Sequence, residues 1–377
     1  MSGSDSSTGV ASTDHAPGLW PVLLFTWLTS FGTAVGWNGI FYVTQHEYGF
    51  SAGRNLVLGI LLGASYALAA WFASPLTRLL RRLAGPGRFL SSRCVLGILL
   101  VLAAGSALLP VLVRAEWGIW ACGLIYNPLA GLIWPVVESY VSSGRRGRAL
   151  NRATGRFNYA WASALIVGMW AMVPLIEDYA RWVIGGLAVI HVLTLPLLLF
   201  FGREPMGHGD PAHEYGAGER ERLRRLLLMF RVSLVSSYAL LAALGPLLPF
   251  LMGGVGIGIA WKPAVASSWM VMRLGAMIVM GNWAGWHGRG VVALVAFACM
   301  LVGFIGALTA SGAFALIGAL AMLGLGVGIV YSAAIYYALE VGSTEVDAGG
   351  KHEAFIGVGY TVGPIGTLAL ERAFGVS

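Results

Sequence analysis

Apolar segments long enough to cross a lipid bilayer recur along almost the whole chain, and they restrict its fold more than any other feature. A membrane-spanning helix needs about 20 mostly apolar residues. Segments of this kind follow one another, with short polar links, at 19–44, 52–76, 91–113, 117–141, 155–176, 182–201, 226–252, 264–286, 290–310, 313–339 and 354–371. The sequence therefore predicts an all-α fold, a polytopic membrane bundle of eleven helices.

The composition agrees with a membrane bundle and argues against other classes. Hydrophobic residues make up 57% of the chain and charged residues 11%, whereas about 25% of the residues of a soluble domain are charged. The basic residues are spread over short loops, without the aromatic-interleaved stripe of a nucleic-acid-binding surface. Metal-ligand spacings, phosphate-binding loops and nucleophile elbows are missing from the sequence. We therefore expect no enzyme, no catalytic residue, no metal, no cofactor and no nucleic-acid partner. The expected partners are the lipid bilayer and a small-molecule substrate, and the oligomeric state is left open.

The arginine and lysine residues predict the orientation of the bundle. The loops on one side carry 18 of them, and the loops on the other side carry four. Because positively charged loops stay in the cytoplasm, we expect a multi-pass protein of the cell (inner) membrane with a cytoplasmic N-terminus. The longest internal polar stretch, 202–225, separates six expected helices from five. The expected divisions are a disordered cytoplasmic tail at 1–18, a six-helix half at 19–201, a cytoplasmic linker at 202–225 and a five-helix half at 226–377.

Several segments of the first half look like segments at equivalent places in the second half. ASPLTRLLRR (73–82) and GNWAGWHGRG (281–290) both follow the second helix of their half. IWPVVESY (133–140) and IYYALEVG (335–342) each end a fourth helix with Glu138 or Glu340. Such an internal repeat predicts two pseudo-symmetric halves.

These repeated segments resemble the major facilitator superfamily of membrane transporters. The family carries the signature G-x-x-x-D-R-x-G-R-R after the second helix. Here Thr77 replaces the aspartate, which in the family helps to lock the cytoplasmic gate. The segment around Gly359, Gly363, Pro364 and Gly366 resembles the family's Gly-Pro motif, which marks a helix that bends and packs closely. The resemblance implies gating roles for Arg78, Arg81, Arg82, Arg289, Gly363 and Pro364.

The family has twelve spans, whereas only eleven are expected here. Two explanations stay open from the sequence: a chain that is naturally one helix short, and a chain whose C-terminal end is missing. The family's twelfth helix lies outside the transport pathway, so neither explanation removes the pathway that the resemblance implies.

Arg273 is the ionisable residue expected deepest in the membrane. It lies nine residues after Ala264, where the eighth span is expected to begin, which is roughly 14 Å at 1.5 Å per residue. A charge at this depth is costly and marks functional sites. None of the 17 acidic residues is expected at the same depth. The partner of Arg273 is then a substrate anion, helix carbonyls in a water-filled cavity, or an aromatic face such as that of Trp269; a purely structural brace between two helices is the alternative.

The resemblance implies that spans one, four, seven and ten line a central cavity. It nominates Trp37, Asn38, Tyr126, Asn127, Tyr238 and Tyr331 as substrate-binding residues beside Arg273 and Trp269. The alternative for each is ordinary packing between helices. Glu138 and Glu340 are expected at the cytoplasmic rim, where they either close a gate by pairing with loop arginines or are plain interfacial carboxylates.

These features favour a secondary active transporter that moves a small solute by alternating access. An intramembrane arginine without a carboxylate partner favours an anionic solute. The expected lack of a carboxylate in mid-membrane argues against a proton-coupled drug exporter. The alternative is a non-transporting scaffold of the same fold that binds a partner protein, which the altered gate signature supports.

Overall fold

The computed structural model describes residues 18–82, 90–145, 147–206, 217–341 and 346–374. Every regular element in these ranges is a helix. The first half of the chain contains α1 (Trp20–Phe31), the π-helix η1 (Gly32–Gly39), α2 (Ile40–Tyr48), α3 (Ala52–Trp71), α4 (Ala73–Arg81), α5 (Ser92–Ala107), α6 (Leu109–Leu112), α7 (Glu116–Ser142), α8 (Gly147–Ala171), α9 (Ala180–Thr194) and the 3-10 helix η3 (Leu195–Phe200).

The second half of the chain is also entirely helical in its described regular elements. It contains α10 (Ala217–Leu244), η4 (Gly245–Leu247), α11 (Leu248–Gly254), η5 (Ile259–Trp261), α12 (Lys262–Ala266), α13 (Ser268–Asn282), η6 (Ala284–Trp286), α14 (Val291–Leu308), α15 (Ala313–Val341) and α16 (Val346–Phe374).

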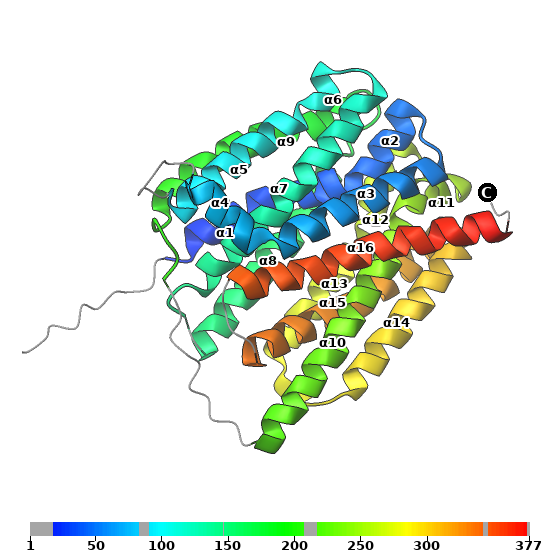
Figure 1. The fold of residues 1–377 in the computed structure, drawn as a ribbon. Helices are drawn as coiled ribbons and strands as arrows, with labels where there is room; N and C mark the ends of the chain where they lie inside the picture. Colours follow the sequence, from blue (N-terminus) through cyan, green and yellow to red (C-terminus); the bar gives the residue numbers. More distant parts are fainter. Residues whose placement is uncertain (1–17, 83–89, 146, 207–216, 342–345, 375–377) are drawn as a thin grey trace, which may run out of the picture.

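Within the described ranges, nine helical segments are long and apolar enough to cross a membrane. They correspond to nine of the eleven expected spans. The expected first span falls outside this criterion because η1 divides it into shorter pieces, and the expected fifth span, α8, carries several arginines in its first half. Both nevertheless run alongside the other helices of the bundle (Figure 1). The chain is a multi-pass membrane protein with an all-α fold.

Local signals explain where several of these helices start and stop. Ser51 and Ser91 cap α3 and α5, because their hydroxyl groups accept hydrogen bonds from the backbone N–H groups of Arg54 and Cys94. Gly49 ends α2 in the left-handed conformation, with a φ of 63° that only glycine adopts without strain. Each cap lies at the edge of an apolar segment, so the helix boundaries follow the sequence pattern there.

Two helices begin before the apolar segment that predicts them. The helix α16 begins at Val346, eight residues before the expected span at 354, and α10 begins at Ala217, within the segment 202–225 that was expected to link the halves. Apolar periodicity marks only the part of a helix that lipid or other helices cover. The polar first turns of α10 and α16 continue the helix beyond that part.

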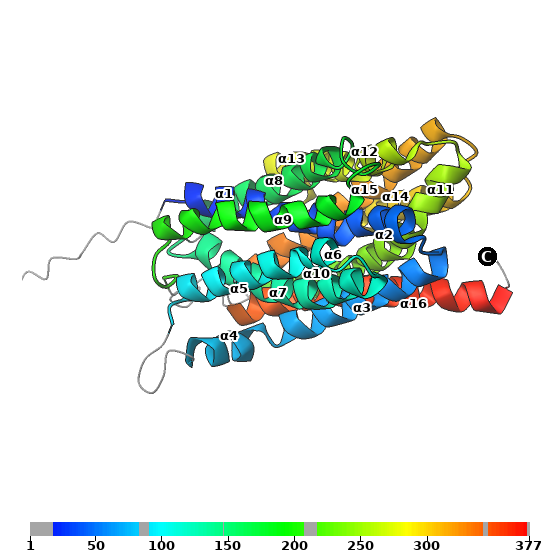
Figure 2. The same cartoon turned by 90° about the horizontal axis from the view of Figure 1, so that it is seen from above.

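The two halves meet along two opposite sides of the bundle. On one side α16 lies between α3 of the first half and α10 of its own half, and on the other side α8 lies against α13. Figure 2 shows both contacts, with α8 and α13 near one edge and α3 and α16 near the other. The space between these two lines of contact is where a central cavity can form.

Glycines allow α16 to approach its neighbours closely. A methyl group added at Gly359 would lie 2.6 Å from the carbonyl oxygen of Val235 in α10, and one added at Gly363 would lie 2.8 Å from the backbone nitrogen of Ala243. On the opposite helix, a methyl group at Gly63 of α3 would lie 2.7 Å from the backbone nitrogen of Thr361. Small residues at these points let helix backbones pack in direct contact. This is the close packing that the Gly-Pro motif implies.

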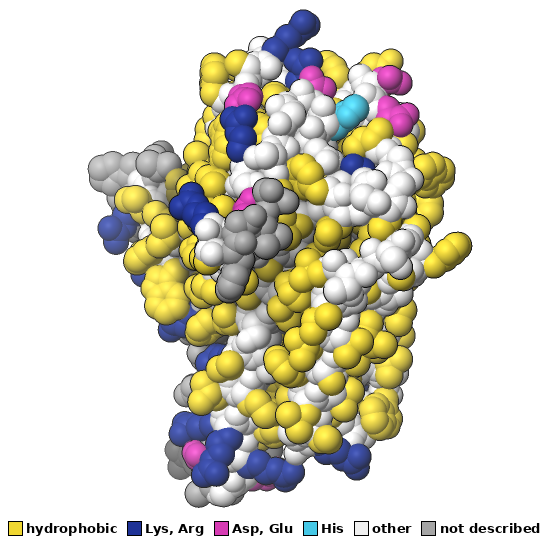
Figure 3. Space-filling view, turned by 90° about the vertical axis from the view of Figure 1, so that its right-hand side faces the viewer, with side chains coloured by type: hydrophobic (Ala, Val, Ile, Leu, Met, Phe, Trp, Pro, Cys, Tyr) yellow, Lys and Arg dark blue, Asp and Glu magenta, His cyan; other side chains and the backbone are white. Residues whose placement is uncertain are grey.

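Charged side chains gather at the ends of the bundle. We call one of them the arginine-rich end. It contains α4 and the first turns of α5 and α8. The arginines at this end include Arg78, Arg81, Arg93, Arg145 and Arg203. At the opposite end, Arg181 pairs with Glu47 at 2.8 Å and Arg54 pairs with Glu116. Most charged residues of the face in Figure 3 lie at its upper and lower edges, with hydrophobic side chains over much of the area between.

Candidate functional site

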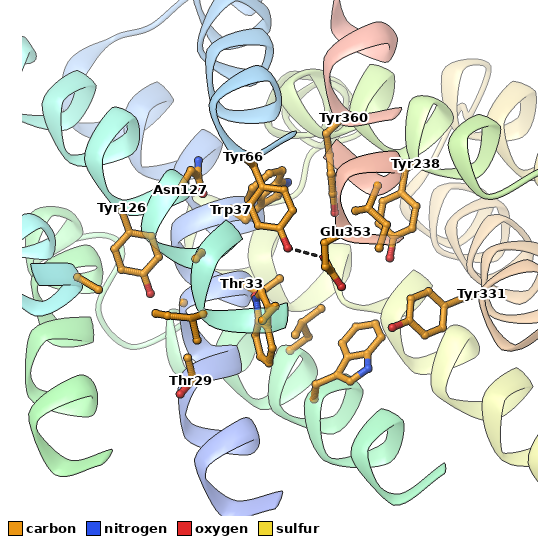
Figure 4. A pocket seen from close by; sticks show the side chains of 18 of the residues that line it. Thr29, Thr33, Trp37, Tyr66, Tyr126, Asn127, Tyr238, Tyr331, Glu353 and Tyr360 are labelled. Carbon is orange, nitrogen blue, oxygen red and sulfur yellow. Dashed lines mark hydrogen bonds between the residues drawn. The ribbon is translucent and has the colours of Figure 1, made fainter. Parts of the chain in front are cut away.

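A cavity lies between the two halves, near the middle of the bundle. It encloses about 850 Å³ of atom-free space, part of which is open to solvent. Side chains of both halves line it (Figure 4), mostly aromatic ones with a few polar groups among them. The lining residues include Thr29, Thr33, Trp37, Tyr66, Tyr126, Asn127, Trp134, Phe157, Trp161, Tyr238, Arg273, Tyr331, Glu353 and Tyr360.

Arg273 extends from α13 into an aromatic cage on the second-half side of this cavity. Its side chain is almost fully buried, with 2% of its surface exposed. One guanidinium N–H group donates a hydrogen bond of 2.5 Å to the hydroxyl group of Tyr238. The guanidinium carbon lies 4.6 Å from the ring of Trp161, 4.8 Å from Tyr331 and 5.8 Å from Trp269. Cation–π contacts of this kind partly replace the water that the cation has lost.

The guanidinium group is not fully satisfied by this cage. Its Nε atom is buried and has no hydrogen-bond partner among the described residues, and no carboxylate there lies within ion-pair distance of it. Of the three expected partners of Arg273, aromatic faces are therefore present, and that of Trp269 is one of them. The unpaired N–H group of Nε is therefore available to donate a hydrogen bond to a ligand in the cavity.

Glu353 corrects the expectation that no acidic residue lies at the depth of Arg273. Because α16 starts at Val346, Glu353 lies two turns inside the helix, and it lines the same cavity. Only 7% of its surface is exposed. Its carboxylate accepts a hydrogen bond of 2.5 Å from the hydroxyl group of Tyr66, which comes from α3 of the other half (Figure 4). The cavity therefore holds one potential anion and one cation.

Polar groups of the first half lie on the opposite side of the cavity. Tyr126 and Asn127 point in from α7 and Thr29 from α1, across from Tyr238 and Tyr331 (Figure 4). The Nδ2 atom of Asn127 and the Oγ1 atom of Thr29 are buried without a hydrogen-bond partner among the described residues. This wall therefore offers at least one unpaired donor to whatever occupies the cavity.

Most of the predicted substrate-binding residues lie together around this cavity, and two do not. Trp37, Tyr126, Asn127, Tyr238, Tyr331 and Arg273 line it. Asn38 and Trp269 instead line a smaller neighbouring space, and the side chain of Asn38 donates a hydrogen bond of 2.8 Å to the backbone carbonyl of Thr33 within η1. His191, a lone histidine within an apolar segment of the sequence, lies behind the wall, where its Nε2 atom is 2.6 Å from the Tyr126 hydroxyl.

Sequence reasoning missed the lining residues from α3, α8 and α16, because the resemblance pointed only to spans one, four, seven and ten. These residues are Tyr66, Phe157, Trp161, Leu165, Glu353, Ile356 and Tyr360. A usable signal exists for the last three. They are spaced i, i+3 and i+7, so they share one face of a helix. A carboxylate and an aromatic ring on the same face of a glycine-rich span indicate a polar cavity rather than lipid.

The predicted gating arginines occupy the arginine-rich end without forming one common cluster. Arg81 pairs with Glu204 at 2.8 Å, and Arg78 donates a hydrogen bond of 2.7 Å to the hydroxyl group of Ser74. Arg82 and Arg289 are exposed. Pro364 is buried within α16, beside the Gly363 contact with α10.

Glu138 forms no ion pair with a loop arginine among the described residues, although such a pair was one of the two roles expected for it. It lies against α16, where its Oε2 atom would be 2.5 Å from a methyl group added at Gly349. Gly349 lies one helical turn before Glu353 in the same helix. The cause is again the early start of α16, which brings a helix to the place where only loop residues were expected. The side chain of Glu340 lies outside the described residues.

The chain resembles solved transporter structures in its fold although its sequence has diverged far from theirs. No protein-family model and no curated protein sequence matches the chain. The crystal structure of the nucleoside transporter NupG matches with a TM-score of 0.66 over 94% of this chain and 91% of that chain, at 12% sequence identity. A mutant of NupG with one aspartate changed to alanine matches with a TM-score of 0.65 over 94% of this chain and 92% of that chain, also at 12% identity.

The match extends over almost the full length of both proteins, so it includes both halves of the bundle and the space between them. At such low identity it concerns the fold and not the substrate. Together with the apolar helices, it shows that this chain shares the all-α membrane-bundle fold of that transporter.

Proposed function

We propose that this protein is a secondary active transporter that moves a small anionic solute across the cell (inner) membrane by alternating access. The observation that carries the proposal is the cavity in mid-bundle, where Arg273 presents a buried and unpaired N–H group. The arginine-rich end is cytoplasmic in this proposal, because positively charged loops stay on that side of the membrane.

The unpaired donors of the cavity favour a solute with acceptor oxygens. A buried donor without a partner costs about 1–3 kcal/mol, and more if it is charged. Arg273 and Asn127 both present such a donor, one from α13 of the second half and one from α7 of the first. A carboxylate can accept two hydrogen bonds from one guanidinium group. An anionic solute would therefore accept the unpaired hydrogen bond of Arg273 and remove the free-energy cost of leaving it unpaired. It would also supply the negative charge that the aromatic cage lacks.

The position of these donors suits alternating access. A solute that contacts both Arg273 and Asn127 would bind to both halves at once, so its affinity depends on how the halves are arranged. Transporters of this architecture bind near the middle of the bilayer and expose the site to one side at a time as the halves rock. The described chain has no nucleotide-binding unit, and a gradient of solute or ions would supply the driving force.

The aromatic lining adds a preference for a solute with a flat apolar part. Trp37 lies between two tyrosines, with its ring centre 4.9 Å from that of Tyr66 and 4.4 Å from that of Tyr360. In the cage, the guanidinium carbon of Arg273 lies 4.6 Å from the ring of Trp161 and 5.3 Å from that of Tyr238. Such surfaces stack on planar groups. Aromatic carboxylates fit both features, and the name of the matching transporter makes nucleosides the second class to test.

The test is a ligand screen followed by transport. We expect aromatic carboxylates, with benzoate as the first probe, to raise the melting temperature of the purified protein and to enter proteoliposomes that contain it. Uptake of uridine with no effect of any anion would keep transport and overturn the anionic solute. If no solute shifts melting and a protein co-purifies in stoichiometric amount, the non-transporting scaffold is correct instead.

A further inference from the structure

We propose that Glu353 accepts a hydrogen bond from the solute, and that the solute is an aromatic carboxylate which also carries a hydrogen-bond donor, either a hydroxyl or an amino group. This inference rests on the proposed function and narrows its solute class. Arg273 binds the carboxylate, and Glu353, which lines the same cavity, binds the donor. Because no acidic residue was expected at this depth, the sequence alone predicts only the first of these two contacts.

A guanidinium group and a carboxyl group share this cavity without pairing with each other. Arg273 comes from α13 and Glu353 from α16, and 2% and 7% of their surfaces are exposed. Arg273 donates a hydrogen bond of 2.5 Å to the hydroxyl group of Tyr238, whereas Glu353 accepts one of 2.5 Å from that of Tyr66. The described part of the chain contains no ion pair between Arg273 and Glu353. Each group therefore keeps its own capacity to bind a ligand.

The carboxyl group of Glu353 has acceptor sites beyond the one that Tyr66 uses. A carboxylate offers about four lone-pair sites, and one hydroxyl group occupies one of them. The bond to Tyr66 also restricts the rotation of the Glu353 side chain, so that its oxygen atoms stay at the cavity (Figure 4). A buried carboxyl group is stabilised by each further donor that it gains. Glu353 is therefore a preformed acceptor site in the cavity wall.

A solute with a carboxylate alone would fit this cavity poorly. Its negative charge would bind Arg273 in the same buried space that holds the carboxyl group of Glu353. Like charges repel strongly where water is excluded. The acceptor sites of Glu353 would also lose water and face an apolar ring. A hydroxyl or amino group on the ring offsets both effects, because it directs a partly positive hydrogen atom at Glu353 and replaces the lost water.

The cavity lining between the two polar groups is continuous and aromatic. Tyr238 bonds to Arg273, and the centre of its ring lies 5.1 Å from that of Tyr360. The ring centre of Trp37 lies 4.4 Å from that of Tyr360 and 4.9 Å from that of Tyr66. A planar ring can stack on this surface while its two substituents contact the two polar groups. A flexible aliphatic chain would lose the stacking and would pay entropy to hold its ends apart.

The first experiment compares matched ligands on the wild-type protein. The measurement is the concentration of each ligand that produces half of the maximal rise in melting temperature. We expect meta- or para-hydroxybenzoate to need a concentration about 10- to 100-fold lower than benzoate, as a hydrogen bond to a charged group provides. The matching methoxybenzoates have the oxygen but no donor and should bind no better than benzoate. Benzoate is smaller and methoxybenzoate is larger than hydroxybenzoate, so ligand size does not explain this order. Equal concentrations for all of these ligands would overturn the inference.

The second experiment removes the acceptor from the cavity wall. Glu353→Met replaces the carboxyl group by an apolar side chain of similar length, so the preference for hydroxybenzoate over benzoate should disappear. Binding of benzoate itself should stay the same or become tighter, because a like charge has been removed. Glu353→Gln keeps one acceptor oxygen and should keep part of the preference. The control Glu116→Gln, an exposed acid at the opposite end of the bundle, should keep all of it.

Opposite changes for two ligands separate recognition from structure. A variant that only lost its bond to Tyr66 and shifted α16 would weaken both ligands together. Equal losses of hydroxybenzoate and benzoate binding in folded Glu353→Met or Glu353→Gln protein would therefore overturn the inference. Glu353 would then be a structural partner of Tyr66.

The same measurements separate this inference from the proposed function. If benzoate and hydroxybenzoate bind equally well and Arg273→Gln weakens both, the anionic solute stands and the donor contact at Glu353 is overturned. If uridine raises the melting temperature and no carboxylate does, the anionic solute is overturned together with the solute class inferred here.

Discussion

Replacing Arg273 by glutamine is expected to weaken binding of an anionic solute by about 10- to 100-fold. A hydrogen bond to a charged group contributes about 1.5–3 kcal/mol, and each 1.4 kcal/mol corresponds to a factor of ten in affinity. Glutamine keeps part of the volume and one polar group but removes the charge and the unpaired Nε–H group. The measurement is the concentration of benzoate that produces half of the maximal rise in melting temperature, together with the initial rate of uptake.

Two further variants separate binding from structure. Arg273→Lys keeps the charge but loses the planar fork, so its affinity should lie between that of the wild type and that of the glutamine variant. Arg114→Gln removes an exposed arginine at the opposite end of the bundle and should leave affinity unchanged. Unaltered binding by a well-folded Arg273→Gln protein would mean that the guanidinium group only braces α13 against the aromatic residues around it.

Replacing Gly363 by valine is expected to cause the largest loss of stability among single changes in the Gly-Pro segment. A side chain at this position would collide with the carbonyl oxygen of Ala239 and would lie 2.8 Å from the backbone nitrogen of Ala243. Backbone atoms cannot rotate away as a flexible side chain can, so α10 and α16 would have to separate. Overpacking of this kind costs about 1–3 kcal/mol and occasionally more. The measurement is the melting temperature of the purified protein in detergent.

The same helix offers a matched control for this change. Gly366 belongs to the same segment, and a methyl group added there would meet no atom within 4 Å. Gly366→Val therefore carries the same change in helix propensity and hydrophobicity without the collision. Its melting temperature should stay close to that of the wild type. Equal losses in both variants would show that backbone propensity, and not contact with α10, limits stability at Gly363.

The spans and their order could be predicted from the sequence because the bilayer imposes a simple rule. Lipid offers no hydrogen-bond partner to the backbone, so every segment that crosses it must be helical and mostly apolar over about 20 residues. The boundaries 91–113, 117–141 and 290–310 accordingly agree within a few residues with Ser92–Leu112, Glu116–Ser142 and Val291–Leu308. The two divergent spans, around η1 and α8, are those in which a π-helix or arginines interrupt this pattern.

The cavity could be predicted only in part, because the rule for spans does not say which face of a helix is turned inward. Arg273 stood out from its depth alone, and six of the eight predicted binding residues lie around one space. Trp161 and Tyr66 could not be identified in this way. They belong to helices that pack between the halves, and their sequence neighbours are as apolar or aromatic as those of residues that face lipid.

Glu353 shows most clearly which part of the site could not be predicted from the sequence. By itself, the sequence determined that the chain forms a membrane bundle of related halves with an arginine deep inside, since these features depend on hydrophobicity, periodicity and charge along the chain. Only the tertiary structure decided that α16 begins two turns earlier and sets Glu353 against Tyr66. That outcome depends on glycine contacts between α3, α10 and α16, which hold the helix in place through backbone distances that no pattern along one segment contains.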